Sequence, residues 1–195
     1  VGTTPTELQP VAPAWFADPP ASVPVTLPDG ESLTEVFLAQ ARRQPGRTIL
    51  ADQTGGSLTY RDVITSIMVL VPQIERVGGR YVGIMLPASA GATVIYFATL
   101  FAGKVPVMVN WTVGTRNMIH SLDLLGVQCV LTAGRLVQKI ESQGGNLEGL
   151  KNRFLLMEDL RQRITTRSKI TAAVRARLSW SSLARRKTDE IAVVL

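Results

Sequence analysis

From residue 81 onward, apolar positions alternate between short continuous runs and longer segments with helical spacing. The short runs predict buried strands, and the longer segments predict the helices that cover them. This strand–helix alternation predicts an α/β fold with a doubly wound, mostly parallel sheet flanked by helices. The predicted strands are 81–86, 105–109, 128–132, 153–157 and 191–195, and the predicted helices are 89–102, 115–125 and 136–142.

Two helices and a short strand are predicted before this alternation. The first helix covers 33–43, with Ser32 as its N-cap and Glu35 completing a capping box. A strand at 47–52 follows. The second helix runs from residue 60 to about 77, with Thr59 as its cap, Asp62 in its first turn and a kink at Pro72. Its apolar residues form one stripe that predicts a buried face, namely Val63, Ile67, Leu70, Val71 and Ile74.

The first 30 residues differ in composition from the rest of the 195-residue chain. They hold seven of the 11 prolines, and each proline removes a backbone donor. We therefore expect residues 1–30 to form a linker or extended arm, with the α/β domain at 31–195. The chain has neither an initiator methionine nor a signal peptide, so we expect a piece of a longer cytoplasmic protein.

The net charge of +6 comes from one segment. Residues 161–187 contain nine lysines and arginines and no acidic residue, whereas the remainder is mildly acidic. If 160–187 is helical, it aligns the apolar residues Leu160, Ile164, Ile170, Val174 and Leu178. Three interpretations remain open: a charged helix packed on the domain by that apolar line, an amphipathic helix on an anionic membrane surface, or a nucleic-acid contact. With one interleaved aromatic residue, nucleic acid is the least favoured.

Several kinds of chemistry are excluded by residue counts. The chain has one cysteine, Cys129, and one histidine, His120, too few for a His/Cys metal site or a Cys–His nucleophile pair. The pattern predicts a buried inert thiol and a surface or half-buried helix histidine. Three common phosphate, dinucleotide and hydrolase loop motifs are also absent.

An uncharged stretch at 81–103 is long enough for a membrane span, but its centre at 87–91 favours a buried strand–loop–helix step.

Three segments carry a resemblance to a known family. They are 57–63 (SLTYRDV), 82–87 (VGIMLP) and 100–110 (LFAGKVPVMVN), and they resemble the adenylate-forming (AMP-binding) ligases. Further segments at 110–117, 130–132 and 156–161 resemble the acyl-[acyl-carrier-protein] synthetase branch, which is often fused behind a 2-acylglycerophosphoethanolamine acyltransferase. The resemblance covers about residues 33–195. It implies the N-terminal subdomain of such a ligase.

The resemblance also implies an activity for the longer protein. Such an enzyme uses ATP and Mg2+ to convert a fatty acid to an acyl-adenylate, and then passes the acyl group to acyl carrier protein or coenzyme A, with phospholipid re-acylation as one use of the product. The family's phosphate loop normally follows a strand like 191–195, so the chain is expected to stop before it. No catalytic residue of the family falls on this chain, and the chain alone is predicted to be inactive.

Two groups of residues remain as candidate contacts. Asn110, Trp111 and Thr112 follow the predicted strand at 105–109, and ligands of open α/β sheets bind at carboxyl ends of strands, so they are candidates for the substrate cleft. The basic residues are candidates for contact with the acidic carrier or with an anionic membrane at its inner face, namely Arg161, Arg163, Arg167, Lys169, Arg175 and Arg177. The alternative is a non-catalytic Rossmann-like module with a basic helix that binds a membrane or a partner.

Overall fold

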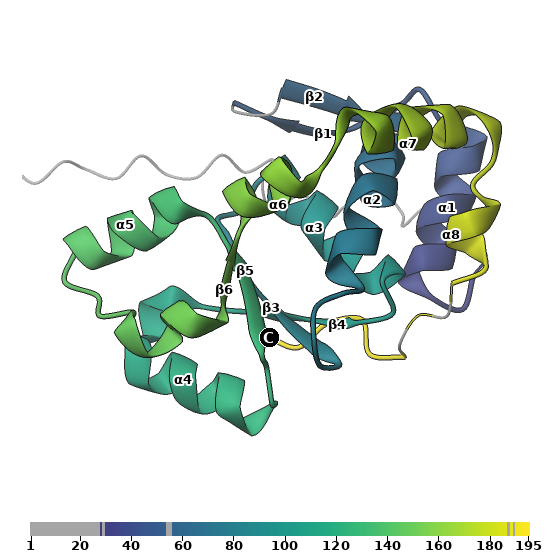
Figure 1. The fold of residues 1–195 in the computed structure, drawn as a ribbon. Coiled ribbons are helices and arrows are strands. Elements are labelled where there is room, and N and C mark those ends of the chain that lie inside the picture. Colours follow the sequence, from purple (N-terminus) through teal and green to yellow (C-terminus); the bar gives the residue numbers. More distant parts are fainter. Residues whose placement is uncertain (1–27, 29, 54–55, 187, 189) are drawn as a thin grey trace, which may run out of the picture.

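A computed structural model of the chain describes residues 28, 30–53, 56–186, 188 and 190–195. Its centre is a parallel sheet in the order β4-β3-β5-β6, with helices on both faces (Figure 1). The strands are β3 (Tyr81–Met85), β4 (Val105–Met108), β5 (Cys129–Thr132) and β6 (Phe154–Leu156). The predicted fold class is confirmed. The proline-rich arm predicted for 1–30 lies almost wholly outside the described residues.

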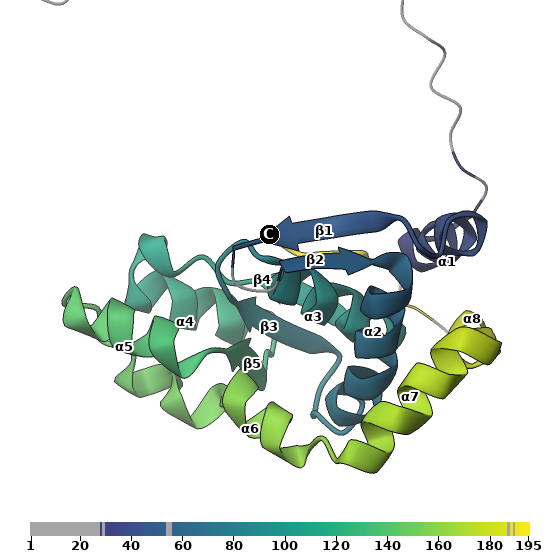
Figure 2. The same cartoon turned by 90° about the horizontal axis from the view of Figure 1, so that it is seen from above.

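A small antiparallel hairpin stands apart from this sheet. It pairs β1 (Thr48–Asp52) with β2 (Gly56–Thr59). Figure 2 shows the hairpin beside the helices α2 and α3, which it contacts. The strand predicted at 47–52 is therefore present. Its partner, β2, was not predicted as a strand, because four residues give too short an alternation to separate a strand from a turn.

One face of the sheet is covered by helices from both ends of the described chain. Val82, Ile84 and Leu131 point into this larger core, where Ile64, Ile67 and the other inward residues of the neighbouring helices are fully buried. The helices on this side are α1 (Leu33–Arg43), α2 (Tyr60–Ile74), α3 (Ala90–Phe101), α6 (Met157–Arg163), α7 (Thr166–Leu178) and α8 (Ser181–Ala184).

The opposite face carries a smaller core built from Met85, Val107 and Val130. It is covered by α4 (Thr115–Leu124), α5 (Gly134–Ser142) and the 3-10 segment η3 (Glu148–Arg153). Gly83 sits between these strands, where a Cβ would come within 2.9 Å of Val130 and 3.2 Å of Val109. Only a residue without a side chain lets the strands pack at this distance.

The two early helices begin at the predicted caps, but the capping box predicted for Ser32 and Glu35 is wrong, because the Glu35 carboxylate accepts from the Glu31 N–H instead of the Ser32 N–H. Ser32 accepts a hydrogen bond from the Glu35 backbone, and Thr59 and Asp62 form a reciprocal capping box. The carboxylate of Asp62 accepts from both the backbone and the hydroxyl of Thr59, and these bonds lower the Asp62 pKa. The second helix ends at Ile74 rather than near residue 77, because the Val77 N–H turns back to the Ile74 carbonyl.

Candidate functional site

The turn after β4 lies at the carboxyl end of the parallel sheet. Asn110 Oδ1 accepts a hydrogen bond from the Thr112 N–H at 2.9 Å and from the Thr112 hydroxyl at 2.7 Å. These bonds cap the 3-10 segment η2 (Trp111–Val113), and Asn117 Nδ2 then donates to the Val113 carbonyl. The polar atoms of the predicted cleft residues thus hold one another in a tight turn.

The three cleft candidates differ in their exposure. Asn110 and Thr112 are exposed, while the Trp111 ring is half-buried and packs against the smaller core. The structure brings the three together at the end of a strand, as the sequence predicts. A substrate role for them stays a prediction.

The end of the described chain returns to this same edge. The Met108 N–H donates to the Val194 carbonyl at 2.8 Å, and the Val194 N–H donates to the Pro106 carbonyl at 3.0 Å. Val194 thereby forms a parallel bridge to Val107 on the outer side of β4. The strand predicted at 191–195 is reduced to this bridge, and it delivers Leu195 to the carboxyl edge, where that side chain is 96% exposed.

Two carboxylates at this edge were not singled out from the sequence. Asp52 Oδ2 accepts a hydrogen bond at 2.7 Å from the Ala90 N–H, at the start of α3. Glu158 accepts from the Gly134 N–H, at the start of α5, through both of its oxygens at 3.2 and 3.3 Å. Each carboxylate occupies a helix N-terminus where an anion could otherwise bind. No local pattern reveals such pairs, because the partners lie 38 and 24 residues apart.

Thr132 ends β5 at the same edge and is fully buried. Its hydroxyl has no hydrogen-bond partner among the described residues. An unpaired buried hydroxyl costs free energy. The pattern of the sequence gives no sign of this, because Thr132 looks like an ordinary strand residue.

These residues do not form a site for ATP and Mg2+. Within the described part of the chain, no three His, Cys, Asp or Glu side chains are grouped as metal ligands. The N-termini of α3 and α5, which could face phosphate oxygens, are taken by Asp52 and Glu158. Acyl adenylation needs donors and cations around the triphosphate, so no step of it can be assigned to these residues.

Cys129 is less buried than the sequence predicts, whereas His120 is the surface helix residue that it predicts. Cys129 is half-buried, and its burial raises the pKa of the thiol to about 11, against an opposing effect of Lys104. A thiol that stays protonated is a poor nucleophile. His120 is exposed on α4.

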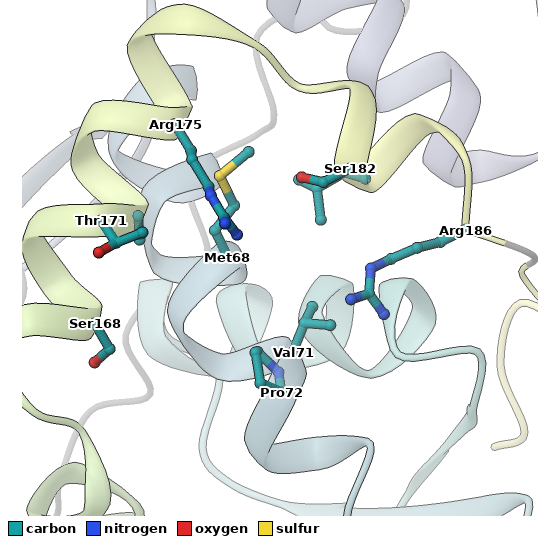
Figure 3. A pocket seen from close by; sticks show the side chains of 10 residues that line it. Met68, Val71, Pro72, Ser168, Thr171, Arg175, Ser182 and Arg186 are labelled. Carbon is teal, nitrogen blue, oxygen red and sulfur yellow. The ribbon is translucent and has the colours of Figure 1, made fainter.

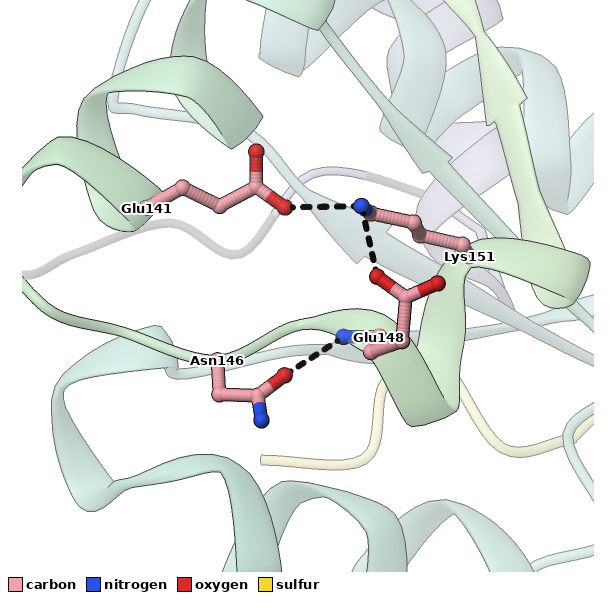
Figure 4. Close-up of polar contacts among 4 residues, drawn as sticks. All are labelled: Glu141, Asn146, Glu148 and Lys151. Atoms are coloured by element: carbon pink, nitrogen blue, oxygen red, sulfur yellow. Dashed lines mark hydrogen bonds and ion pairs between the residues drawn. The ribbon is translucent and has the colours of Figure 1, made fainter.

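A second polar cluster joins α5 to η3 at the surface (Figure 4). Lys151 lies 2.8 Å from Glu148 and 3.1 Å from Glu141, and Asn146 accepts a hydrogen bond from the Glu148 N–H. Hydrogen bonds to Glu148 and Glu141 raise the Lys151 pKa. A lysine held protonated in this way ties two segments together and is unsuited to act as a base.

The basic segment is three helices rather than one. Arg161 and Arg163 lie on α6, while Arg167, Lys169, Arg175 and Arg177 lie on α7, and all six are exposed. The interpretation that this segment packs through its large apolar residues is wrong for α7. Its buried residues are Ala172 and Ala176, whereas Ile170, Val174 and Leu178 are exposed.

A hollow of about 240 Å³ lies where α7 and α8 meet α2 (Figure 3). Met68, Val71 and Pro72 of α2 form its apolar wall, and Arg175 reaches over Met68. Arg186 closes the other end and forms an ion pair with Glu75. The hollow belongs to a packing seam between helices, away from the carboxyl edge of the sheet.

Comparison with known proteins decides the family. The family model for "AMP-binding enzyme" matches residues 37–193, most of the chain. The chain belongs to the AMP-binding enzyme family. The turn at Asn110 falls inside the matched region, which ends one residue before Val194.

Two curated relatives of this AMP-binding chain are similar in sequence. One is a long-chain-fatty-acid–CoA ligase of Bacillus subtilis (strain 168), 27% identical over 64% of this chain. The other is the medium/long-chain-fatty-acid–CoA ligase FadD6 of Mycobacterium tuberculosis, 30% identical over 69% of this chain. In each case the match spans only 23% of the relative's length.

The fold is shared with a solved structure, the N-terminal subdomain of NpsA from Klebsiella oxytoca. The TM-score is 0.54 at 21% identity, over 69% of this chain and 33% of that one. This supports the same α/β subdomain architecture. In the described part of the chain, no helix has the length and apolar character needed to cross a bilayer.

Proposed function

We propose that this chain is the N-terminal subdomain of an ATP-dependent fatty-acid ligase. In the longer protein, a fatty-acid carboxylate attacks the α-phosphorus of ATP, giving acyl-adenylate and pyrophosphate. A thiol then attacks the acyl carbonyl, giving a thioester and AMP. Family membership and the two fatty-acid–CoA ligase relatives support this reaction class.

The observation that carries the proposal is the parallel bridge between Val194 and Val107. It brings Leu195 to the carboxyl edge beside the turn of Asn110, Trp111 and Thr112. Ligands of open α/β sheets bind at this edge. A phosphate-binding loop that followed Leu195 would therefore emerge next to the proposed cleft residues, and it would supply the donors that the described residues lack.

The acceptor of the acyl group is the finer part of the proposal. The resemblance of residues 156–161 to the acyl-carrier-protein synthetase branch favours a carrier-protein thiol, with phospholipid re-acylation as the use of the product. The two relatives favour coenzyme A instead. Both acceptors present the same thiol, so one assay with each of them separates the two.

The test compares the 195-residue chain with the full reading frame that contains it. We expect the full protein to catalyse pyrophosphate exchange that depends on a medium- or long-chain fatty acid with ATP and Mg2+, and the short chain to show none. Thioester formation is then measured with coenzyme A and with acyl carrier protein. A folded full protein that gives no exchange with any fatty acid would favour a non-catalytic binding module and overturn the proposal.

The same assay tests the cleft. Trp111→Phe in the full protein should raise the KM for fatty acid several-fold while leaving the KM for ATP unchanged, since the ring contributes contact area rather than charge. Val113→Ala, in the same 3-10 segment, is the matched control. Equal KM values for the two variants would remove Trp111 from the cleft.

A further inference from the structure

The exposed face of α7 carries an apolar stripe with basic residues beside it. Ile170, Val174 and Leu178 follow one another at intervals of four residues, so they form a continuous stripe along the helix. Their exposed fractions are 59%, 49% and 80%. Arg167 lies three residues before Ile170, and Arg177 lies three residues after Val174, so both arginines flank the stripe.

The stripe is exposed because α7 is already held by its opposite side. Ala172 and Ala176 pack against α2, and Leu183 of α8 closes the same core. Arg175 is turned toward Met68, into the seam between α7 and α2 (Figure 3). The side of α7 that bears the stripe has no covering element among the described residues.

A hollow rich in arginine adjoins the C-terminal end of the stripe. Arg42 from the end of α1, Arg61 from the start of α2 and Arg177 from the end of α7 line it, together with Leu178 and Trp180. Its volume is about 300 Å³, and no acidic residue lines it. The nearby carboxylate of Asp62 is already engaged by Thr59. Leu178 belongs to both the hollow and the stripe, so the two features form one continuous surface.

We propose that this surface docks onto a bilayer that contains anionic phospholipid. The stripe would enter the boundary between headgroups and acyl chains, and the arginine hollow would take a headgroup phosphate. Charge complementarity supports this partner, because residues 161–187 carry nine basic side chains and no acidic one. A nucleic acid would neutralise the arginines but would leave three aliphatic side chains in water.

The test is co-sedimentation of the chain with vesicles of phosphatidylcholine containing about one-third phosphatidylglycerol, at low salt. We expect binding to these vesicles and none to pure phosphatidylcholine. A triple variant, Arg42→Gln with Arg61→Gln and Arg177→Gln, removes the arginines of the hollow. It should bind the vesicles roughly 100-fold more weakly, since each basic side chain near an anionic surface contributes about a fivefold effect. Higher salt should weaken wild-type binding in the same way.

Two matched control variants test whether binding depends on where the basic and apolar side chains lie, and not only on how many the chain has. The variant Arg116→Gln with Arg135→Gln and Lys139→Gln loses the same charge from α4 and α5 and should bind like the wild type apart from a weak effect of net charge. Leu178→Ser should weaken binding about tenfold. Leu124→Ser, at an α4 residue that is 78% exposed, should leave it unchanged.

Three results would overturn the proposal. One is an absence of binding to anionic vesicles. Another is equal weakening by the two charge variants, which would indicate attraction by net charge alone. The third is a concentration-dependent dimer that Leu178→Ser dissociates while vesicle binding stays unchanged, which would assign the stripe to a second copy of the chain. Thermal unfolding of each variant confirms that it is folded, and the altered side chains are all exposed.

Discussion

Helices α2 and α7 carry the same kind of apolar stripe, and the fold uses the two stripes in opposite ways. In α2 the stripe faces inward, with Ile67 and Ile74 fully buried in the larger core. In α7 the stripe of Ile170, Val174 and Leu178 faces outward. Helical spacing therefore identifies a face of a helix, but it does not say whether the protein covers that face.

The difference follows from what each helix packs against. α2 packs against both α3 and α7 and lines the larger core, so a broad side-chain surface is needed to fill the space around it. α7 packs on the outside of α2 through Ala172 and Ala176, whose small side chains let the two helices lie close together. Large residues on that side of α7 would hold the helices apart.

The sharpest way to test this comparison is to truncate one residue of each stripe. Ile67→Ala should lower the free energy of unfolding by about 2–5 kcal/mol, because it leaves a cavity in a fully buried site. Val174→Ala should change it by no more than about 0.5 kcal/mol, because Val174 is 49% exposed and its truncation leaves no buried cavity. Urea unfolding measures both. Similar losses in the two variants would show that α7 buries its stripe.

A smaller effect is expected from enlarging one residue on each side of α7. Ala176→Leu should destabilise the chain by about 1–3 kcal/mol, since the extra atoms would be forced into the contact with α2. Ala173→Leu is the matched control on the exposed side, where the substitution should be nearly neutral. A midpoint of thermal unfolding that is equal for the two variants would contradict the packing described for α7.

The smallest expected effect concerns the start of α2. Because the Asp62 pKa is lowered in the folded chain, its carboxylate stabilises the fold above about pH 4, and this contribution is lost as the pH falls through the folded pKa. Asp62→Asn should cost about 0.5–1 kcal/mol at pH 7 and less at pH 3. Unfolding at several pH values measures the difference, and a constant gap between variant and wild type would rule out this role of the charge.

Much of the fold could be predicted because it depends on neighbours in sequence. The apolar runs predicted the four strands of the sheet, and the caps at Ser32 and Thr59 predicted where two helices begin. Each of these signals acts over a few residues. The hairpin of β1 and β2 was missed as a pair because its strands are short. The prediction of one long basic helix was wrong, because the helix breaks near residues 164–165 and 179–180 without a glycine or proline to signal the breaks.

The sequence by itself determined the α/β class, the resemblance to the AMP-binding family and the position of the Asn110 turn at the end of a strand. Only the tertiary structure decided which residues meet at that edge: Asp52 and Glu158 reach helix starts far away in the chain, and Val194 pairs with β4. It also decided that the stripe of α7 faces outward. The physical reason is that local propensity and spacing fix each element, whereas contacts between distant segments depend on how the elements pack.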